Sequence, residues 1–174
     1  MKQMIKIYKV GLEAIPTIER LSGEIWRKVY PAIVPIGQIE YLLNEWHSPE
    51  ALSDQMTKQG HQFLIIEWDE ETIGYASYAV KDKEDPYRFR LNKLYVQPEV
   101  HGKGIGKSII HFVTNEIKPL GATVLELNVH KRNPAVAFYK HIGFVIAKEE
   151  VTEIAYGYLL DDFIMELDLM KNEL

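Results

Sequence analysis

The stretch that decides the fold is "LYVQPEVHGKGIGKSII", residues 94–110. It begins as an apolar strand that stops before Pro98, continues through three alternating glycines, and ends in the apolar stripe of a helix. A turn of this kind presents the unpaired N–H groups of a helix N-terminus, which favour a phosphate. Glycines let the backbone approach such a ligand closely. The stretch therefore predicts a phosphate-binding turn, and a tight turn that merely needs glycine is the alternative.

Two common phosphate-binding motifs do not fit this turn. The Walker A motif needs a glycine five residues before Gly106, and His101 occupies that place. The nearest upstream glycine, Gly102, is one residue too close, which removes backbone N–H groups from the phosphate ring. The dinucleotide fingerprint has a different glycine spacing and should follow the first strand of a βαβ unit. Both motifs are disfavoured.

Outward from the turn, the hydrophobic pattern predicts a mixed α/β layer fold. Gly74 marks a bulge inside one strand, and the charged segment "KDKEDPY" (81–87) is expected to be a loop. The expected elements are strand 5–10, helices 15–29, 36–46 and 49–56, strands 62–68, 72–80 and 89–96, helix 104–118, strand 123–129, a short helix in 133–144 closed by Gly143, and one or two strands within 146–169.

Length and composition bound the class of protein. A chain of 174 residues with 47% hydrophobic and 26% charged residues predicts a single globular domain over residues 1–174. The net charge of -5 has the wrong sign for a nucleic-acid binder. The absence of cysteine excludes disulfides, thiolate metal sites and an acyl-cysteine intermediate. No window has the roughly 18 apolar residues of a membrane span, so we expect a cytoplasmic protein that binds no membrane.

Two segments together resemble the GNAT acetyltransferases. The acetyl-CoA loop of that family follows its fourth strand with the pattern Arg/Gln-x-x-Gly-x-Gly/Ala, and residues 94–110 match it with His101 in the Arg/Gln place. Residues 125–144, "LELNVHKRNPAVAFYKHIGF", are similar to a second motif of the family. The resemblance covers residues 62–168 and leaves the first 60 residues as the variable part that faces the substrate. The matches in the second motif are Asn133, Ala137, Tyr139, Gly143 and Phe144.

The resemblance implies a fold and a cofactor. The fold is α/β (α+β), a mixed and mostly antiparallel central sheet with helices on both faces and two strands splayed apart at the cofactor site. The cofactor is acetyl-CoA, with CoA as product, and loop N–H groups would hold its pyrophosphate, so that His101 affects only a side-chain contact. Asn133 is either a helix cap or a cofactor contact, or both. The implied cofactor-binding residues are Leu94, Tyr95, Val96, His101, Gly102, Lys103, Gly104, Ile105, Gly106, Lys107, Asn133 and Tyr139.

The resemblance also assigns a catalytic acid. The phenol of Tyr139 can give a proton to the departing CoA thiolate, and simple helix packing is the alternative role of this side chain. Many family members carry a basic Glu on the fourth strand, but "FRLNKLYV" (89–96) contains no carboxylate. Glu126 and His130, which share one face of the following strand, are candidate bases. A chain of water molecules is the third possibility.

The acceptor is expected to be a primary amine. Soft similarities such as "IWRKVYP" and "DDFIMELDL" resemble the bacterial PaiA-type spermidine/spermine N-acetyltransferases, and the family resemblance suggests a homodimer. Trp26, Tyr30 and Tyr156 are candidate substrate residues, because aromatic faces attract alkylammonium groups, with core packing as the alternative. A protein amine, a CoA-binding module without catalysis and a nucleotide-binding protein remain the other functions. Further candidates near the substrate are Tyr41, Tyr158, Glu24, Asp161 and Asp162.

Overall fold

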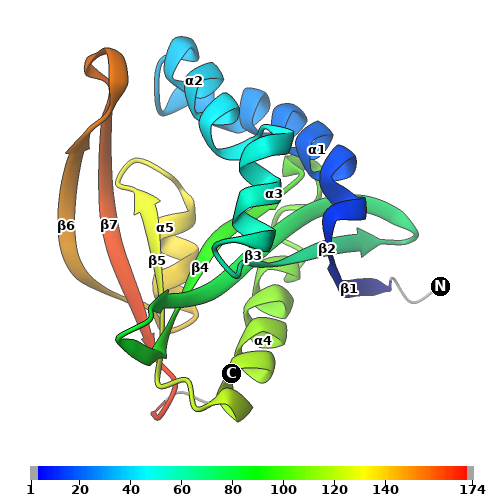
Figure 1. Cartoon of the computed structure of the whole chain (residues 1–174), viewed down its shortest axis with the longest axis vertical. Coiled ribbons are helices and arrows are strands. Elements are labelled where there is room, and N and C mark those ends of the chain that lie inside the picture. Colours follow the sequence, from blue (N-terminus) through cyan, green and yellow to red (C-terminus); the bar gives the residue numbers. More distant parts are fainter. Residues whose placement is uncertain (1–3, 172–174) are drawn as a thin grey trace. The chain divides into compact units, whose positions relative to one another are not determined.

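The computed structural model describes residues 4–171, which form five α-helices and seven strands (Figure 1). No helix in this described range is long and apolar enough to cross a membrane. In chain order the elements are β1 (Ile5–Val10), α1 (Ile15–Val29), α2 (Ile36–His47), α3 (Pro49–Thr57), β2 (Gln62–Trp68), β3 (Glu71–Asp82), β4 (Asp85–Val96), α4 (Ile105–Ile117), β5 (Val124–His130), α5 (Ala135–His141), β6 (Val145–Glu153) and β7 (Leu159–Asp168).

The strands follow the order β1-β2-β3-β4-β5-β7-β6. Strands β4 and β5 run parallel, whereas the β1–β2, β2–β3, β5–β7 and β6–β7 pairs are antiparallel. The mixed, mostly antiparallel sheet predicted from the sequence is therefore confirmed. The chain divides into two compact units. Unit 1 takes in the described residues up to Ala79 together with Lys93–Phe112, and unit 2 takes in Val80–Asn92 and the described residues from Val113 onward.

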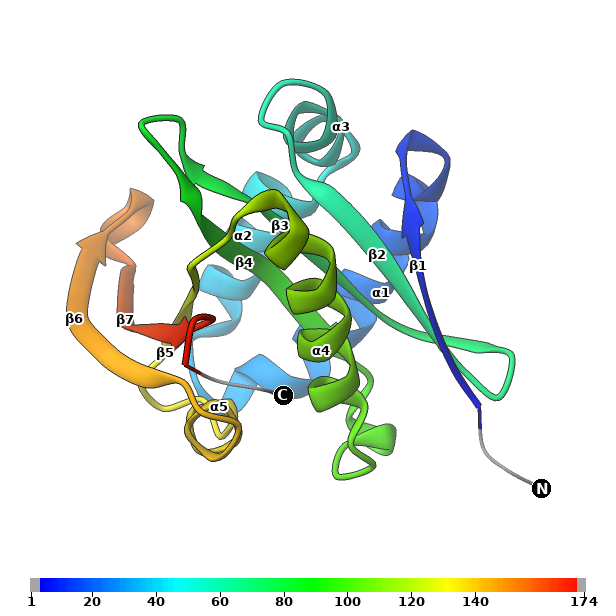
Figure 2. The ribbon, with the colours of Figure 1, turned by 90° about the horizontal axis from the view of Figure 1, so that it is seen from below.

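Unit 1 is built around the apolar stripe of α1. Ile18, Leu21 and Ile25 of this helix are buried, and they pack with residues of α3, β2 and β3. Burial of each such side chain contributes roughly 1.5–3 kcal/mol. Figure 2 shows α1 on one face of β2 and β3 and the N-terminal part of α4 on the other. The remaining buried members of the cluster are Ala14, Leu52, Phe63, Ile65 and Tyr75.

Unit 2 has a sheet with one apolar and one polar face. Leu125, Leu127 and Val129 of β5 are buried, as the alternation of side chains along a strand requires. The intervening residues Glu126, Asn128 and His130 share the opposite face. The register Glu126↔Glu166 and His130↔Asp162 extends this polar face onto β7. The polar face of unit 2 is therefore made from side chains of several strands.

Most element boundaries agree with the sequence prediction to within two or three residues. Ser48 caps α3, since its Oγ accepts a hydrogen bond from Ala51 N at 3.3 Å. The expected charged loop 81–87 is wrong, because β3 continues to Asp82 and β4 begins at Asp85. The carboxylates of these two aspartates accept hydrogen bonds from Glu84 N and Tyr87 N, which closes a tight hairpin turn in place of a loop.

Gly74 lies beside a β-bulge, as predicted. The register changes from Ile66↔Gly74 to Glu67↔Thr72, which leaves Ile73 as the extra residue. The Ile73 carbonyl accepts a hydrogen bond from Gln97 N at 2.8 Å, just after β4 ends. A Cβ at position 74 would lie 2.5 Å from the Tyr95 carbonyl oxygen and 3.1 Å from Val96 Cα. Glycine is therefore required for β3 to approach the end of β4 this closely.

We expect Gly74→Ala to lower the free energy of unfolding by roughly 1–3 kcal/mol, the usual cost of overpacking a close contact. The obstacle is backbone, which cannot rotate away. Gly11→Ala is the matched control, because its Cβ would meet only the flexible carboxylate of Glu13 at 3.0 Å. Urea unfolding monitored by circular dichroism gives both values. Equal stabilities of the two variants would contradict the steric argument.

Candidate functional site

The glycine turn of unit 1 has the backbone that an anion-binding loop needs. Gly102 and Gly104 have φ angles of +79° and +78°, which other residues rarely adopt. The Gly104 carbonyl accepts a hydrogen bond from Ser108 N at 3.1 Å, so α4 starts here and its first N–H groups have no partner within the helix. No protein atom lies within 4 Å of a Cβ built at either glycine. The turn is therefore open on the side where a phosphate would approach.

The side chains of this turn point to different roles. Ile105 is buried, so only its backbone can serve a ligand. The Nζ of Lys103 lies 5.7 Å from the ring centroid of Trp68. Nε2 of His101 lies 2.9 Å from the Val96 carbonyl oxygen, and because a carbonyl can only accept, this nitrogen is the donor. His101 therefore ties the loop to the last residue of β4.

In unit 2, β4 and β5 are paired over a short distance only. Their parallel register covers three residue pairs, from Arg88↔Val124 to Arg90↔Glu126. Strand β5 nevertheless continues to His130, and all of it pairs with β7 on its other side. Strand β4 continues to Val96, so the predicted Leu94 and Val96 follow the paired segment. Within unit 2 the β4–β5 ladder therefore ends at the pair Arg90↔Glu126.

Asn133 and Tyr139, the predicted residues of the second motif, belong to unit 2. The Asn133 Oδ1 accepts a hydrogen bond from Ala135 N at 2.9 Å at the start of α5, which supports its role as a helix cap. Tyr139 is 7% exposed, and its ring lies 5.5 Å from that of Phe144 in an edge-on contact. Both residues are therefore held in fixed positions by their surroundings.

The two candidate bases are engaged in other contacts. Glu126 is 1% exposed and lies within 4 Å of Lys81, Arg88 and Arg90, which compensate its buried charge. The Nδ1 of His130 accepts a hydrogen bond from Arg132 N at 3.1 Å, so the lone pair of the neutral ring is already in use. Burial lowers the pKa of His130 and keeps the ring neutral near pH 7. These contacts favour structural roles for both side chains.

Two of the predicted substrate residues form part of an aromatic cluster in unit 1. The ring of Trp26 stacks on that of Tyr30 with centroids 4.6 Å apart, and it lies 5.2 Å from that of Tyr95. Trp26 is 2% exposed, so it supports this cluster from inside the core. Tyr156 is 85% exposed and lies in the β6–β7 connection of unit 2. A direct contact with a ligand is thus available to Tyr156 but not to the Trp26 ring.

A group of buried polar side chains beside this cluster has no counterpart among the predicted residues. The Tyr75 hydroxyl lies 2.9 Å from His47 Nε2. Burial and the charge of Lys93 lower the pKa of His47 well below its ordinary value. Lys93 itself is 8% exposed and, among the described residues, forms no hydrogen bond or ion pair; its Nζ lies 5.9 Å from the Phe63 ring centroid. Burial lowers the pKa of Lys93 to about 8.

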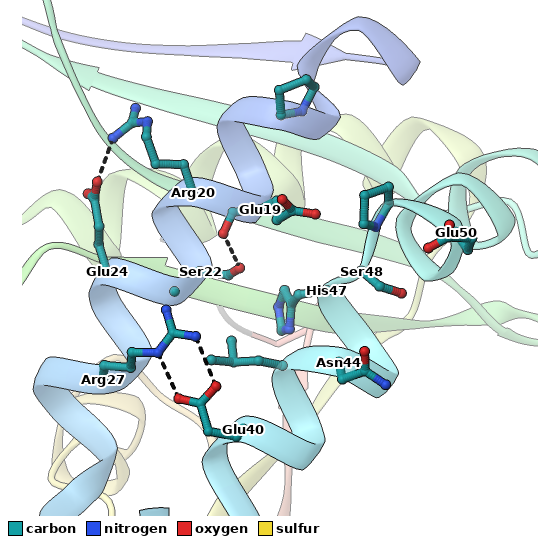
Figure 3. A pocket seen from close by; sticks show the side chains of 14 residues that line it. Glu19, Arg20, Ser22, Glu24, Arg27, Glu40, Asn44, His47, Ser48 and Glu50 are labelled. Atoms are coloured by element: carbon teal, nitrogen blue, oxygen red, sulfur yellow. Dashed lines mark hydrogen bonds and ion pairs between the residues drawn. The ribbon is translucent and has the colours of Figure 1, made fainter.

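A groove of about 890 Å³ lies between α1, α2 and the start of α3 (Figure 3). Two ion pairs cross its surface, Arg27 with Glu40 at 2.7 Å and Arg20 with Glu24 at 3.0 Å. His47 forms part of its floor, and Glu24, one of the further candidates near the substrate, lines it, whereas none of the predicted cofactor residues does. Glu19 and Glu50 also line the groove, so its charged side chains are acidic in excess.

The open glycine turn at the N-terminus of α4 has the geometry of a phosphate-binding site. A family model described as "Acetyltransferase (GNAT) domain" matches residues 33–155. The chain therefore belongs to the GNAT acetyltransferase family, as the sequence motifs predicted, and it is an N-acetyltransferase that uses acetyl-CoA.

Several known proteins are similar to this chain. The spermidine N(1)-acetyltransferase of Thermoplasma acidophilum is 29% identical over 167 residues, which covers 93% of this chain and 96% of that protein. The crystal structure of the PaiA N-acetyltransferase from Thermoplasma acidophilum in complex with coenzyme A superposes with a TM-score of 0.76 at 26% identity, covering 95% and 99% of the two chains. The peptidyl-lysine N-acetyltransferase YjaB of Salmonella typhimurium is 33% identical over 93 residues, covering 49% of this chain and 61% of that protein.

We expect Lys93→Met to stabilise the protein near pH 7. The folded-state pKa of about 8 lies below the ordinary 10.5, so folding opposes protonation of this amine. The resulting penalty is fully present below pH 8, at most about 3 kcal/mol, and it vanishes as pH rises through 10.5. Urea unfolding at pH 7 and pH 10 should show a gain that shrinks with pH. Lys58→Met is the control, because its side chain is 72% exposed and the substitution should change the free energy of unfolding little. A Lys93→Met variant with the wild-type free energy of unfolding at pH 7 would contradict the predicted penalty.

Proposed function

We propose that this N-acetyltransferase transfers the acetyl group of acetyl-CoA to a primary amine of a polyamine such as spermidine or spermine. The observation that carries the proposal is the similarity to the spermidine N(1)-acetyltransferase, which extends over 93% of the chain. It therefore includes the N-terminal helices, the part of the fold that varies with the acceptor. The net charge of -5 suits a polycationic substrate.

The cofactor fits the residues that the chain provides. Acetyl-CoA supplies an activated acyl group on a thioester. The backbone from Gly102 to Lys107 would hold its pyrophosphate, because the positive φ angles and the open space above both glycines leave the N–H groups accessible. Backbone groups of Leu94 and Val96 would orient its acyl arm. Tyr139 would give a proton to the thiolate that leaves.

A protein amine is the second candidate acceptor. The similarity to the peptidyl-lysine N-acetyltransferase supports it, but over only 49% of the chain. A lysine side chain and a polyamine share the same alkylammonium group, so the catalytic chemistry would be unchanged. The proposal also places the enzyme in the cytoplasm as a homodimer, in line with the resemblance to PaiA-type enzymes.

An amine panel tests the acceptor. CoA thiol release would be followed with spermidine, spermine, putrescine, free amino acids and lysine-containing peptides at equal concentrations. We expect kcat/KM to be at least ten-fold higher for the triamine and tetramine than for the amino acids and peptides. A peptide as the best substrate would establish the second candidate, and turnover with none of the amines would contradict both.

We expect Gly104→Ala to weaken acetyl-CoA binding about ten-fold or more. A side chain forced into the left-handed conformation costs roughly 1–2 kcal/mol and shifts the loop N–H groups away from the pyrophosphate. Gly60→Ala is a matched control, since Gly60 has a φ of +71° and open space around its Cβ position but lies before β2, outside the loop. Calorimetric titration with acetyl-CoA should show a loss of affinity for Gly104→Ala only. An equal loss of affinity in both variants would contradict a specific role of the loop in binding the pyrophosphate.

A further inference from the structure

The groove between α1, α2 and the start of α3 has an excess of negative charge. All of its lining residues belong to unit 1. Of the described residues that line it, four bear carboxylates and two bear guanidinium groups. Arg20 pairs with Glu24, and Arg27 forms two hydrogen bonds with the carboxylate of Glu40. The two cations of the groove are therefore already compensated by these two carboxylates.

The other two carboxylates of the groove are available to a ligand. Glu19 lies on α1 and Glu50 in the first turn of α3, on opposite sides of the groove (Figure 3). Both side chains are exposed, and neither forms an ion pair or a hydrogen bond with another described residue. A cation that enters the groove would meet both charges without having to displace an arginine.

The floor of the groove contains a buried polar atom that lacks a partner. His47 is 2% exposed, and Figure 3 shows its ring projecting from the end of α2 toward α1. Its Nε2 lies 2.9 Å from the Tyr75 hydroxyl, whereas its Nδ1 has no hydrogen-bond partner among the described residues. In a neutral imidazole one nitrogen donates and the other accepts. With Nε2 donating to the Tyr75 oxygen, Nδ1 can accept a hydrogen bond from an ammonium group.

The α1 wall of the groove is hydrogen-bonded to the segment that follows β4. Glu24 accepts a hydrogen bond from Gln97 Nε2 at 3.0 Å. Lys28, one turn further along α1, donates to the side-chain oxygen of the same glutamine at 3.3 Å. Gln97 directly follows Val96, whose backbone is proposed to orient the acyl arm. The groove therefore has one wall next to the strand end at which the acetyl group is expected.

A linear polyamine matches the chemistry of this groove. Such a molecule carries ammonium groups at intervals along an apolar chain. The carboxylates of the groove are also spaced along its length, since Glu19 and Glu24 are separated by roughly 7.5 Å along the axis of α1. Pro16, Leu43 and Pro49 line the groove as well and offer apolar surface to methylene groups. A monoamine could use only one of these carboxylate positions.

We propose that the groove holds the charged, non-reacting part of a polyamine acceptor, and that Glu19, Glu50 and the Nδ1 of His47 bind its distal ammonium group. This inference rests on the proposed transfer to a polyamine and gives that substrate a binding site. The reacting amine would lie beyond Glu24, toward the end of β4. The groove favours polyamines over monoamines, because only a second ammonium group gains the contacts with Glu19 and Glu50.

The test is the preference for spermidine over propylamine, which has no second ammonium group. CoA thiol release gives kcat/KM for both amines. In the double variant Glu19→Gln/Glu50→Gln the ratio of the two values should fall roughly ten-fold, the loss expected for two exposed ion pairs. Glu45→Gln is the matched control and should keep the ratio, because Glu45 is an exposed residue of α2 that does not line the groove.

A ratio measurement separates recognition from a structural role, since a folding defect would lower both rates together. A double variant that keeps the wild-type ratio would overturn the inference and leave the proposed function standing. Calorimetric titration with spermidine gives a second readout that needs no turnover. Weaker spermidine binding by the double variant, together with turnover of no amine by the wild type, would contradict the proposed function alone. Spermidine binding of wild-type strength by the double variant would contradict the groove.

Discussion

The short backbone pairing between β4 and β5 is the constraint on which the strand arrangement of unit 2 depends. Every N–H and C=O group of a strand needs a partner, and an interrupted ladder leaves such groups available to a ligand. Strand β5 can leave β4 after three pairs because it is paired with β7 along its whole length, from Val124 to His130. Strand β5 therefore keeps a complete ladder on its β7 side where its ladder with β4 ends.

The end of β4 is fixed by a second set of contacts, in unit 1. The bulge at Ile73 accepts a hydrogen bond from Gln97, and Gly74 allows the backbone of Tyr95 to approach closely. His101 then joins the Val96 carbonyl to the glycine turn. Strand end and loop are consequently connected through hydrogen bonds and not only through the chain. A shift of β4 would displace the N–H groups of the turn, so the bulge contributes to the loop's geometry.

Much of this arrangement is predictable from the sequence because it depends on local rules. Glycine at alternating positions before an apolar helical stripe indicated the turn, and runs of β-branched and other apolar residues indicated β2 and β5 to within one residue. The hairpin at Asp82–Asp85 was missed, since charged residues suggested a loop whereas two aspartate caps close a tight turn there. Lys93 was missed for a related reason: composition gives no sign that a lysine lies in a core. Contacts between distant segments decide the burial of Lys93, whereas local side-chain hydrogen bonds decide the turn.

The polar face of unit 2 illustrates a further limit of reading along the chain. The fourth strand contains no carboxylate near its end, and the next strand contains Glu126, whose charge is compensated by three cations. Strand register, however, brings Asp162 next to His130 although 32 residues separate them in the sequence. Register, and not distance along the chain, thus decides which side chains share a face of the sheet, so a strand that is far away in the sequence can supply a carboxylate to the polar face of unit 2.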